Sequence, residues 1–125
     1  MILKETRLKV ADNSGARLVK CIQILNKTVG REGDSIIITV KKAFPKKKAQ
    51  KGKVYKGIVV QCKKVQKRLF GHSLYFGSNR VILLKKLDNK KMNYVPLGTR
   101  IFFKLSFFLR LKGFLKLLLI SLGQL

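Results

Sequence analysis

The chain has 125 residues, with 29 lysines and arginines against 5 aspartates and glutamates, which gives a formal net charge of +24. Its length fits one domain with a buried core, and a hydrophobic content of 46% argues against a wholly disordered basic tail. Solubility alone needs only a small net charge, so an excess of this size favours a polyanionic partner, above all nucleic acid.

The first elements along the chain are predicted to be a strand, a tight turn and a second strand. Basic and apolar residues alternate over 7–10, which is the pattern of a half-buried strand. Asp, Asn, Ser and Gly at 12–15 favour a tight turn, because the short polar side chains bond back to the backbone and glycine accepts a positive φ. A new apolar run over 18–24 begins the second strand. By residue chemistry alone, this unit is a β-hairpin or a barrel corner.

Later segments add further short strands separated by turn residues. The predicted elements are a strand over 35–43, a strand over 54–64, a hairpin over 69–76 and a strand over 80–86. Gly57 marks a bulge or a point of close packing, and the hairpin turns near Gly71 and His72. Five or six short strands joined by such turns predict a mainly β fold, a small closed barrel. We expect a single domain over 1–125, with the barrel and its basic loops in 1–100 and a helical segment in 101–125.

The C-terminal segment is apolar enough to raise the question of a membrane helix. A spanning helix needs about 20 mostly apolar residues with few charges, whereas four basic residues interrupt this run: Lys104, Arg110, Lys112 and Lys116. The same charges leave no clean apolar face on an amphipathic helix, and Gly113 divides the segment. We therefore predict two short helices that pack on the barrel and on neighbouring protein or RNA, without membrane insertion.

Three basic elements are predicted to bind RNA. The loop 41–53 holds seven lysines and no acid, so its tip can enter a groove and touch several phosphates. A second cluster lies at the foot of the next hairpin, and the turn 12–17 can grip phosphate or a bulged base through its backbone N–H groups and Arg17. Any single lysine can instead belong to a solvated face, but the whole set favours RNA, recognised by its shape. The predicted RNA-binding residues are Lys9, Asn13, Ser14, Arg17, Lys41, Lys42, Lys46, Lys47, Lys48, Lys51, Lys53, Lys63, Lys64, Lys67 and Arg68.

Aromatic residues are interleaved with these basic elements, namely Phe44, Tyr55, Phe70, Tyr75, Phe76 and Tyr94. Aromatic rings can stack on bases, but at alternating strand positions they belong more often to the core. We expect most of the six in the core. Phe44 and Phe70 are the better stacking candidates, because each adjoins a turn.

Residues suited to metal binding or catalysis are sparse. Cys21 and Cys62 are far apart, and His72 is the only histidine, so the four nitrogen or sulfur ligands of a usual zinc site are missing. Metal-dependent nuclease chemistry needs clustered carboxylates, and the five acids are scattered. We expect no metal, no cofactor and no enzymatic activity. A free single-strand-binding barrel stays as an alternative, and it should carry surface aromatics along one groove.

The string LKVADNSGAR over 8–17 is far more specific than its physical pattern. Together with GIVV over 57–60 and GTRIF over 98–102, it resembles the universal large-subunit ribosomal protein family numbered fourteen in the bacterial scheme. The resemblance covers nearly the whole chain. It implies a mainly β fold, a small five-stranded β-barrel with a β-hairpin extension and a short C-terminal α-helical segment. It also implies a non-catalytic, structural role in the large subunit, bound to large-subunit rRNA and to neighbouring ribosomal proteins.

The resemblance also implies a place at the subunit interface. In that family, the face with the GTRIF segment and the C-terminal helices helps to form a bridge to small-subunit rRNA and can be covered by a ribosome-silencing factor. The interface residues expected here are Thr99, Arg100, Arg110, Lys112 and Lys116.

The chain departs from the family after Phe102, where 103–105 replace the usual Gly-Pro-Val, and Phe107 and Phe108 stand where charged residues are expected. A drift toward Phe, Leu, Ile and Lys is what an A+T-rich organellar genome produces. We therefore predict a ribosome of the mitochondrion, in its matrix, with a plastid as second alternative and a bacterial cytoplasm as third.

Overall fold

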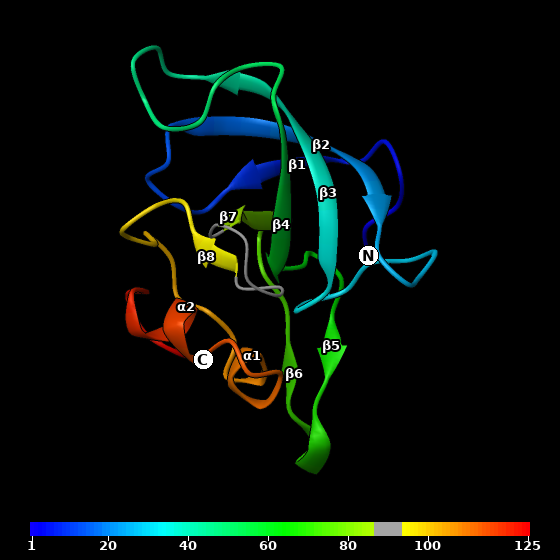
Figure 1. Ribbon diagram of the computed structural model, residues 1–125. Coiled ribbons are helices and arrows are strands. Elements are labelled where there is room, and N and C mark those ends of the chain that lie inside the picture. The colour runs from blue at the N-terminus through cyan, green and yellow to red at the C-terminus, as the bar shows by residue number, and fades with distance from the viewer. Residues whose placement is uncertain (87–93) are drawn as a thin grey trace.

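The computed structural model describes residues 1–86 and 94–125. Its strands are β1 (Arg7–Val10), β2 (Ala16–Ile24), β3 (Ser35–Ala43), β4 (Val54–Gln61), β5 (Gln66–Lys67), β6 (Ser73–Leu74), β7 (Arg80–Lys86) and β8 (Tyr94–Pro96). Its helices are the 3₁₀ turn η1 (Leu69–Gly71), α1 (Phe108–Leu111) and α2 (Leu115–Leu119) (Figure 1). The predicted bounds of β1, β3 and β7 are confirmed, whereas β2 begins earlier and β4 ends earlier than predicted.

Five strands close into a barrel, as predicted. The strands β1, β2, β3, β4 and β7 are hydrogen-bonded in that order, and β1 also pairs with β7 in parallel, which closes the sheet. The other pairs in the barrel are antiparallel. The short strand β8 adds to the outside of β7. Closure removes the free edges that an open five-stranded sheet would expose.

The barrel interior is packed with apolar side chains from alternate strand positions. Gly57 lies where two strands approach closely, because a Cβ there would be 2.7 Å from Val81 Cγ2 and 3.1 Å from Ile38 Cδ1. The pairing register through Gly57 is regular. Of the two predicted roles for this glycine, the structure therefore shows close packing. Cys21 and Cys62 are both buried and free.

The outer face of β4 and β7 carries a second apolar cluster. Ile58 and Val60 of β4 and Ile82 of β7 face the C-terminal segment, which covers them with Ile101, Leu105, Leu109, Leu117 and Leu118. Both faces of these strands are thus buried, which explains why their sequences are continuous apolar runs. The predicted packing of two short helices on the barrel is confirmed. Within the described residues, no helix is long and apolar enough to cross a membrane.

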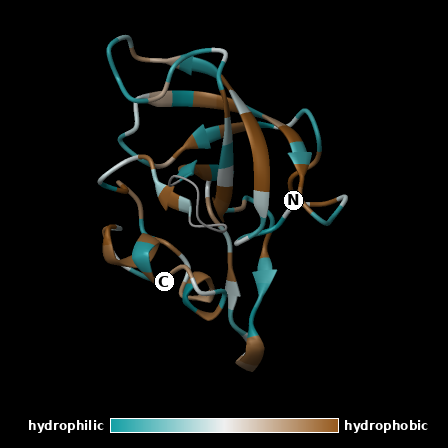
Figure 2. Cartoon of the chain, viewed as in Figure 1, coloured by the Kyte–Doolittle hydropathy of each residue, from teal (hydrophilic) through white to brown (hydrophobic). Residues whose placement is uncertain are grey.

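Two extensions leave the barrel at opposite ends (Figure 1). The loop between β3 and β4 extends from one end, and the β5–β6 hairpin, which turns through η1, extends from the other. The hairpin confirms the prediction of a turn near Gly71 and His72. Figure 2 shows a mostly hydrophilic loop and a hydrophobic hairpin tip, where Leu69 is 85% and Phe70 is 94% exposed.

Candidate nucleic-acid interface

The turn 12–15 is built on a buried aspartate. Asp12 Oδ1 accepts hydrogen bonds from the Ser14 amide at 3.1 Å and from the Ser14 hydroxyl at 2.5 Å, and Oδ2 accepts one from the Leu83 amide at 3.3 Å. Burial raises the pKa of Asp12, and these hydrogen bonds oppose the rise. Ser14 is itself fully buried. Its hydroxyl and amide therefore shape the turn and are not free to reach a ligand.

Asn13 fastens this turn to the GTRIF segment. Its Oδ1 accepts hydrogen bonds from the amides of Thr99 at 2.8 Å and Arg100 at 3.1 Å, and its Nδ2 donates to Thr99 Oγ1 at 2.9 Å. The Asn13 amide donates to the Arg100 carbonyl at 3.2 Å. The polar groups of Asn13 are thus engaged within the chain, while Thr99 and Arg100 stay exposed beside it.

The lysine loop 41–53 lies directly on the same turn. The Phe44 amide donates to the Gly15 carbonyl at 2.9 Å, and the Ala49 amide donates to the Ser14 carbonyl at 3.0 Å. Gly15 has a φ of +101°, and a Cβ there would be 2.2 Å from Lys47 Cβ, so only glycine allows this approach. The loop and the turn therefore form one surface, with Arg17 stacked 5.1 Å from the centre of the Phe44 ring.

All the lysines of the loop are exposed, as is Arg17 beside them, and Lys9 is exposed on β1. The loop lysines are Lys41, Lys42, Lys46, Lys47, Lys48, Lys51 and Lys53. Within the part of the chain that the structure describes, Lys20, Lys27, Arg68 and Lys112 are the basic residues that form ion pairs, and none of the loop lysines is among them. We name this surface, made by the turn 12–17 and the loop 41–53, the upper basic surface.

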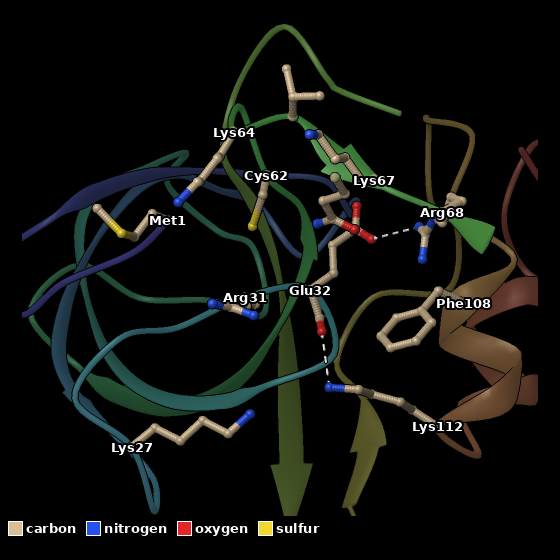
Figure 3. A pocket seen from close by; sticks show the side chains of 12 residues that line it. Met1, Lys27, Arg31, Glu32, Cys62, Lys64, Lys67, Arg68, Phe108 and Lys112 are labelled. Carbon is tan, nitrogen blue, oxygen red and sulfur yellow. Dashed lines mark hydrogen bonds and ion pairs between the residues drawn. The ribbon is translucent and has the colours of Figure 1, made fainter. Parts of the chain in front are cut away.

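The second predicted cluster lies at the opposite end, and we name it the lower basic surface. It contains Lys63, Lys64, Lys67 and Arg68. The lysines are exposed. Arg68 is held within the protein, because its Nη2 forms an ion pair with Glu32 Oε2 at 3.3 Å (Figure 3) and donates a hydrogen bond to the Ser106 hydroxyl. Arg68 thus joins the hairpin to the loop before β3 and to the C-terminal segment. The three predicted RNA-binding elements therefore occupy two separate places, not one.

The acids of the described residues are paired or buried. Glu5 pairs with Lys20, and Asp12 and Glu32 are buried. Burial raises the pKa of Glu32, while the Arg68 guanidinium opposes the rise. Asp34 accepts hydrogen bonds from Lys27 Nζ at 2.9 Å, the Arg31 amide at 2.8 Å and Lys112 Nζ at 3.4 Å. Burial alone would raise the pKa of Asp34, but these donors together lower it.

The predicted interface residues lie on two segments, the 98–100 segment held by Asn13 and the C-terminal helices, and they differ in freedom. Arg110 on α1 and Lys116 on α2 are exposed, whereas Lys112 between the helices bonds to Asp34 and to the Glu32 carbonyl. Sequence reasoning missed these ion pairs, in which Glu32 and Asp34 are buried and their cations are partly exposed. Glu32 and Asp34 stand two positions apart in a basic chain, which was the one available signal that they need internal cations.

The aromatic residues divide as expected, with one exception. Phe76 is buried, and Tyr55 and Tyr94 pack against the two apolar clusters. Phe44 is 52% exposed and Phe70 94%, which agrees with their assignment as the residues next to turns. The prediction was wrong for Tyr75, which is 68% exposed, because the hairpin carries it clear of the barrel.

One family model matches residues 1–123, nearly the whole chain. The family is described as ribosomal protein L14p/L23e. The match spans the barrel, both basic surfaces and the C-terminal segment.

Proposed function

Because the chain belongs to the ribosomal protein L14p/L23e family, a structural and non-enzymatic constituent of the large ribosomal subunit, we propose that it binds large-subunit rRNA through its two basic surfaces. The observation that carries this proposal is the docking of the lysine loop on the turn 12–15. It gathers exposed cations on one surface, and none of the loop lysines forms an ion pair with an acid of the described residues.

The separation of the two basic surfaces defines how RNA would be bound. A single duplex groove could contact the upper basic surface but not the lower one as well, because the two surfaces lie at opposite ends of the barrel (Figure 1). We propose that the protein contacts two distinct rRNA segments and holds them at a fixed spacing. The closed barrel suits this role, because it sets the distance between the two basic surfaces. Contacts to phosphate would then position the two rRNA segments without reading their sequence.

A free single-strand-binding barrel is less well supported. Such a protein needs base-stacking aromatics along one continuous groove. Here the exposed Phe44 belongs to the upper basic surface and the exposed Phe70 to the tip of the opposite hairpin. One strand could not stack on both through a single groove.

We further propose that the subunit-interface face combines the 98–100 segment with the exposed side of the C-terminal helices. Thr99, Arg100, Arg110 and Lys116 supply exposed polar side chains there, and Lys112 stabilises the docking of the segment. This face would bridge to small-subunit rRNA and could receive a ribosome-silencing factor. Neighbouring large-subunit proteins would cover the exposed apolar residues of the same segment, among them Leu111 and Leu119.

The mitochondrial compartment is also a proposal, supported by the rich Phe, Leu, Ile and Lys content of the C-terminal segment. Sedimentation of mitochondrial extract through a high-salt gradient, with this chain followed by mass spectrometry, tests role and compartment together. We expect the chain to migrate with the large ribosomal subunit after the salt wash. Migration as a free or membrane-bound species would contradict the proposed role, and recovery with plastid or bacterial large subunits would correct the compartment.

A further inference from the structure

Phe44 is the only aromatic residue in the turn and the lysine loop that make the upper basic surface. It is 52% exposed, and it belongs to neither apolar cluster of the barrel. A single exposed apolar residue is ordinary by itself. The surroundings of this ring are what indicate a ligand, because they combine a fixed backbone, a stacked guanidinium and lysines without ion pairs.

The backbone around Phe44 is held against the neighbouring turn. On one side of the loop tip, the Phe44 amide donates a hydrogen bond to the Gly15 carbonyl at 2.9 Å. On the other side, the amide of the buried Ala49 donates to the Ser14 carbonyl at 3.0 Å. The loop therefore has a defined position before a ligand arrives, which lowers the entropic cost of ordering it on binding.

The Phe44 ring already carries a cation. The guanidinium carbon of Arg17 lies over the ring, 5.1 Å from its centre, and Arg17 is exposed and forms no ion pair within the described residues. Arg68 lies over Phe108 at a similar 5.0 Å, but there the charge is paired with Glu32 (Figure 3). Aromatic rings and guanidinium planes both stack on nucleic-acid bases. Arg17 and Phe44 thus form a stacking surface whose cation is free to meet an anion.

Lysines stand on both sides of the ring along the chain. Lys42 and Lys46 are each two residues from Phe44, so their Cα atoms lie within about 7 Å of its own. Both are exposed, and neither forms an ion pair in the part of the chain that the structure describes. A nucleotide within an RNA strand has the matching form, a flat base with a phosphate on either side. Stacking aromatics beside cations that bind the backbone are how proteins hold unpaired nucleotides.

The base on this ring must be unpaired. In an intact duplex both faces of a base are covered by its neighbours, whereas a bulge, a loop or a strand end leaves a face free to stack on a side chain. Because Phe44 is the single aromatic residue of this surface, there is room for one stacked base and not for a run of them. This distinguishes the site from the continuous groove of a single-strand-binding barrel.

We propose that the upper basic surface holds one unpaired nucleotide of the rRNA, with its base stacked on Phe44 and its flanking phosphates on Lys42 and Lys46. The inference rests on the proposed RNA-binding function and adds to it the feature of the RNA that is recognised. Every base has a flat face, so the identity of the base matters little. What the surface distinguishes is a bulge or loop from an unbroken duplex.

The test compares two short RNA duplexes, one with a single bulged adenosine and one with an abasic nucleotide at the same bulge. The abasic RNA keeps both phosphates and lacks only the base. Binding to the full chain is measured by fluorescence anisotropy across a range of salt concentrations. We expect the adenosine bulge to bind about tenfold more tightly, the size of one base–aromatic contact. In Phe44→Leu, which stays apolar but cannot stack, this preference should disappear, with the abasic RNA bound as before and the salt slope unchanged.

Two further variants serve as controls. Phe44→Tyr keeps an aromatic ring and should keep the preference for the adenosine bulge. Lys42→Gln removes a cation and leaves the ring in place, so it should weaken both RNAs alike, reduce the salt slope and keep the preference.

Equal affinities for the two RNAs in the unmodified protein, or a Phe44→Leu protein that keeps the preference, would overturn the inference and leave RNA binding intact. Failure to bind either RNA would instead contradict the proposed function. If the RNA comparison shows no effect of the base, while Phe44→Leu weakens retention of the chain in the large subunit, the ring contacts a neighbouring protein and the inference is wrong.

Discussion

Asn13 is the residue that links the most distant parts of the sequence within the proposed interface. Its side chain holds a segment 86 residues further along the chain, and both exposed residues of that segment, Thr99 and Arg100, depend on it for position. The turn chemistry at 12–15 could be predicted from four residues, because the preferences of Asp, Asn, Ser and Gly are local. Its partner could not, because nothing in a turn pattern indicates which distant backbone will accept or donate.

Replacing Asn13 by alanine should therefore loosen the 98–100 segment. The change removes three side-chain hydrogen bonds, and we expect a loss of about 1 kcal/mol in the free energy of unfolding and faster hydrogen exchange at the Thr99 and Arg100 amides. Asn13→Asp keeps the acceptor oxygen for both amides and should cost less. Unchanged exchange in Asn13→Ala would contradict the linking role.

Gly57 provides a test of barrel packing. In Gly57→Ala the new Cβ would crowd Val81, Ile38 and the Ile82 carbonyl, and we expect a loss of about 1–3 kcal/mol in the free energy of unfolding, measured in urea. Gly77 is the matched control, because a Cβ there meets no atom within 4 Å. A Gly57→Ala protein as stable as Gly77→Ala would show that the interior is looser than described.

At the scale of elements, the positions of the main strands could be predicted from the sequence. Which element packs against each face of a strand could not. Strands β3 and β7 have the bounds that β-branched composition indicates. The apolar runs of β4 and β7 did not show which element covers their outer face, because an apolar run fits several partners. The three-residue strand β8 was missed, since it is too short to carry a pattern and forms by pairing with β7.

The C-terminal segment is fastened to the barrel by a charge cluster that should respond to acid. The pKa of Asp34 is lowered in the folded protein, so its contribution to stability is complete above the unfolded value of about 3.9 and is lost as pH falls through the lowered value. We expect Asp34→Asn to be about 1–3 kcal/mol less stable at neutral pH. The difference from the unmodified protein should begin to shrink below about pH 4, as the unfolded carboxylate becomes protonated, and should be lost once the pH falls below the lowered pKa of the folded protein.

Chemical unfolding across pH, followed by circular dichroism, measures this difference. Glu5→Gln is the control, because the carboxylate of Glu5 is exposed and its surface ion pair with Lys20 contributes little. A stability difference for Asp34→Asn that stays constant down to pH 3 would show that the Asp34 charge is not what fastens the segment.

At the scale of the whole molecule, charge predicts the class of partner but not its arrangement. A net charge of +24 indicates that the binding partner is a polyanion. The sequence alone could not show that the turn 12–17 and the loop 41–53 combine, while the cluster near Lys63 lies at the far end, because that depends on which strands pair.

The salt dependence of RNA binding tests the upper basic surface. Removing the charges of Lys46, Lys47 and Lys48 together, as glutamines, should reduce the slope of log affinity against log salt by about 0.9 for each duplex phosphate that the loop no longer neutralises. A control with the same charge change is Lys4, Lys85 and Lys86 to glutamine, residues outside both basic surfaces, and it should alter the slope less. Equal slopes in the two variants would mean that the loop faces away from RNA.

The most direct test of the two-surface account is ultraviolet cross-linking of the intact large subunit, followed by mass spectrometry of RNA-linked peptides from this chain. We predict cross-links from 41–53 and from 63–72, each to a different rRNA segment. Cross-links confined to one of these regions, or both regions linked to the same short rRNA segment, would contradict the account.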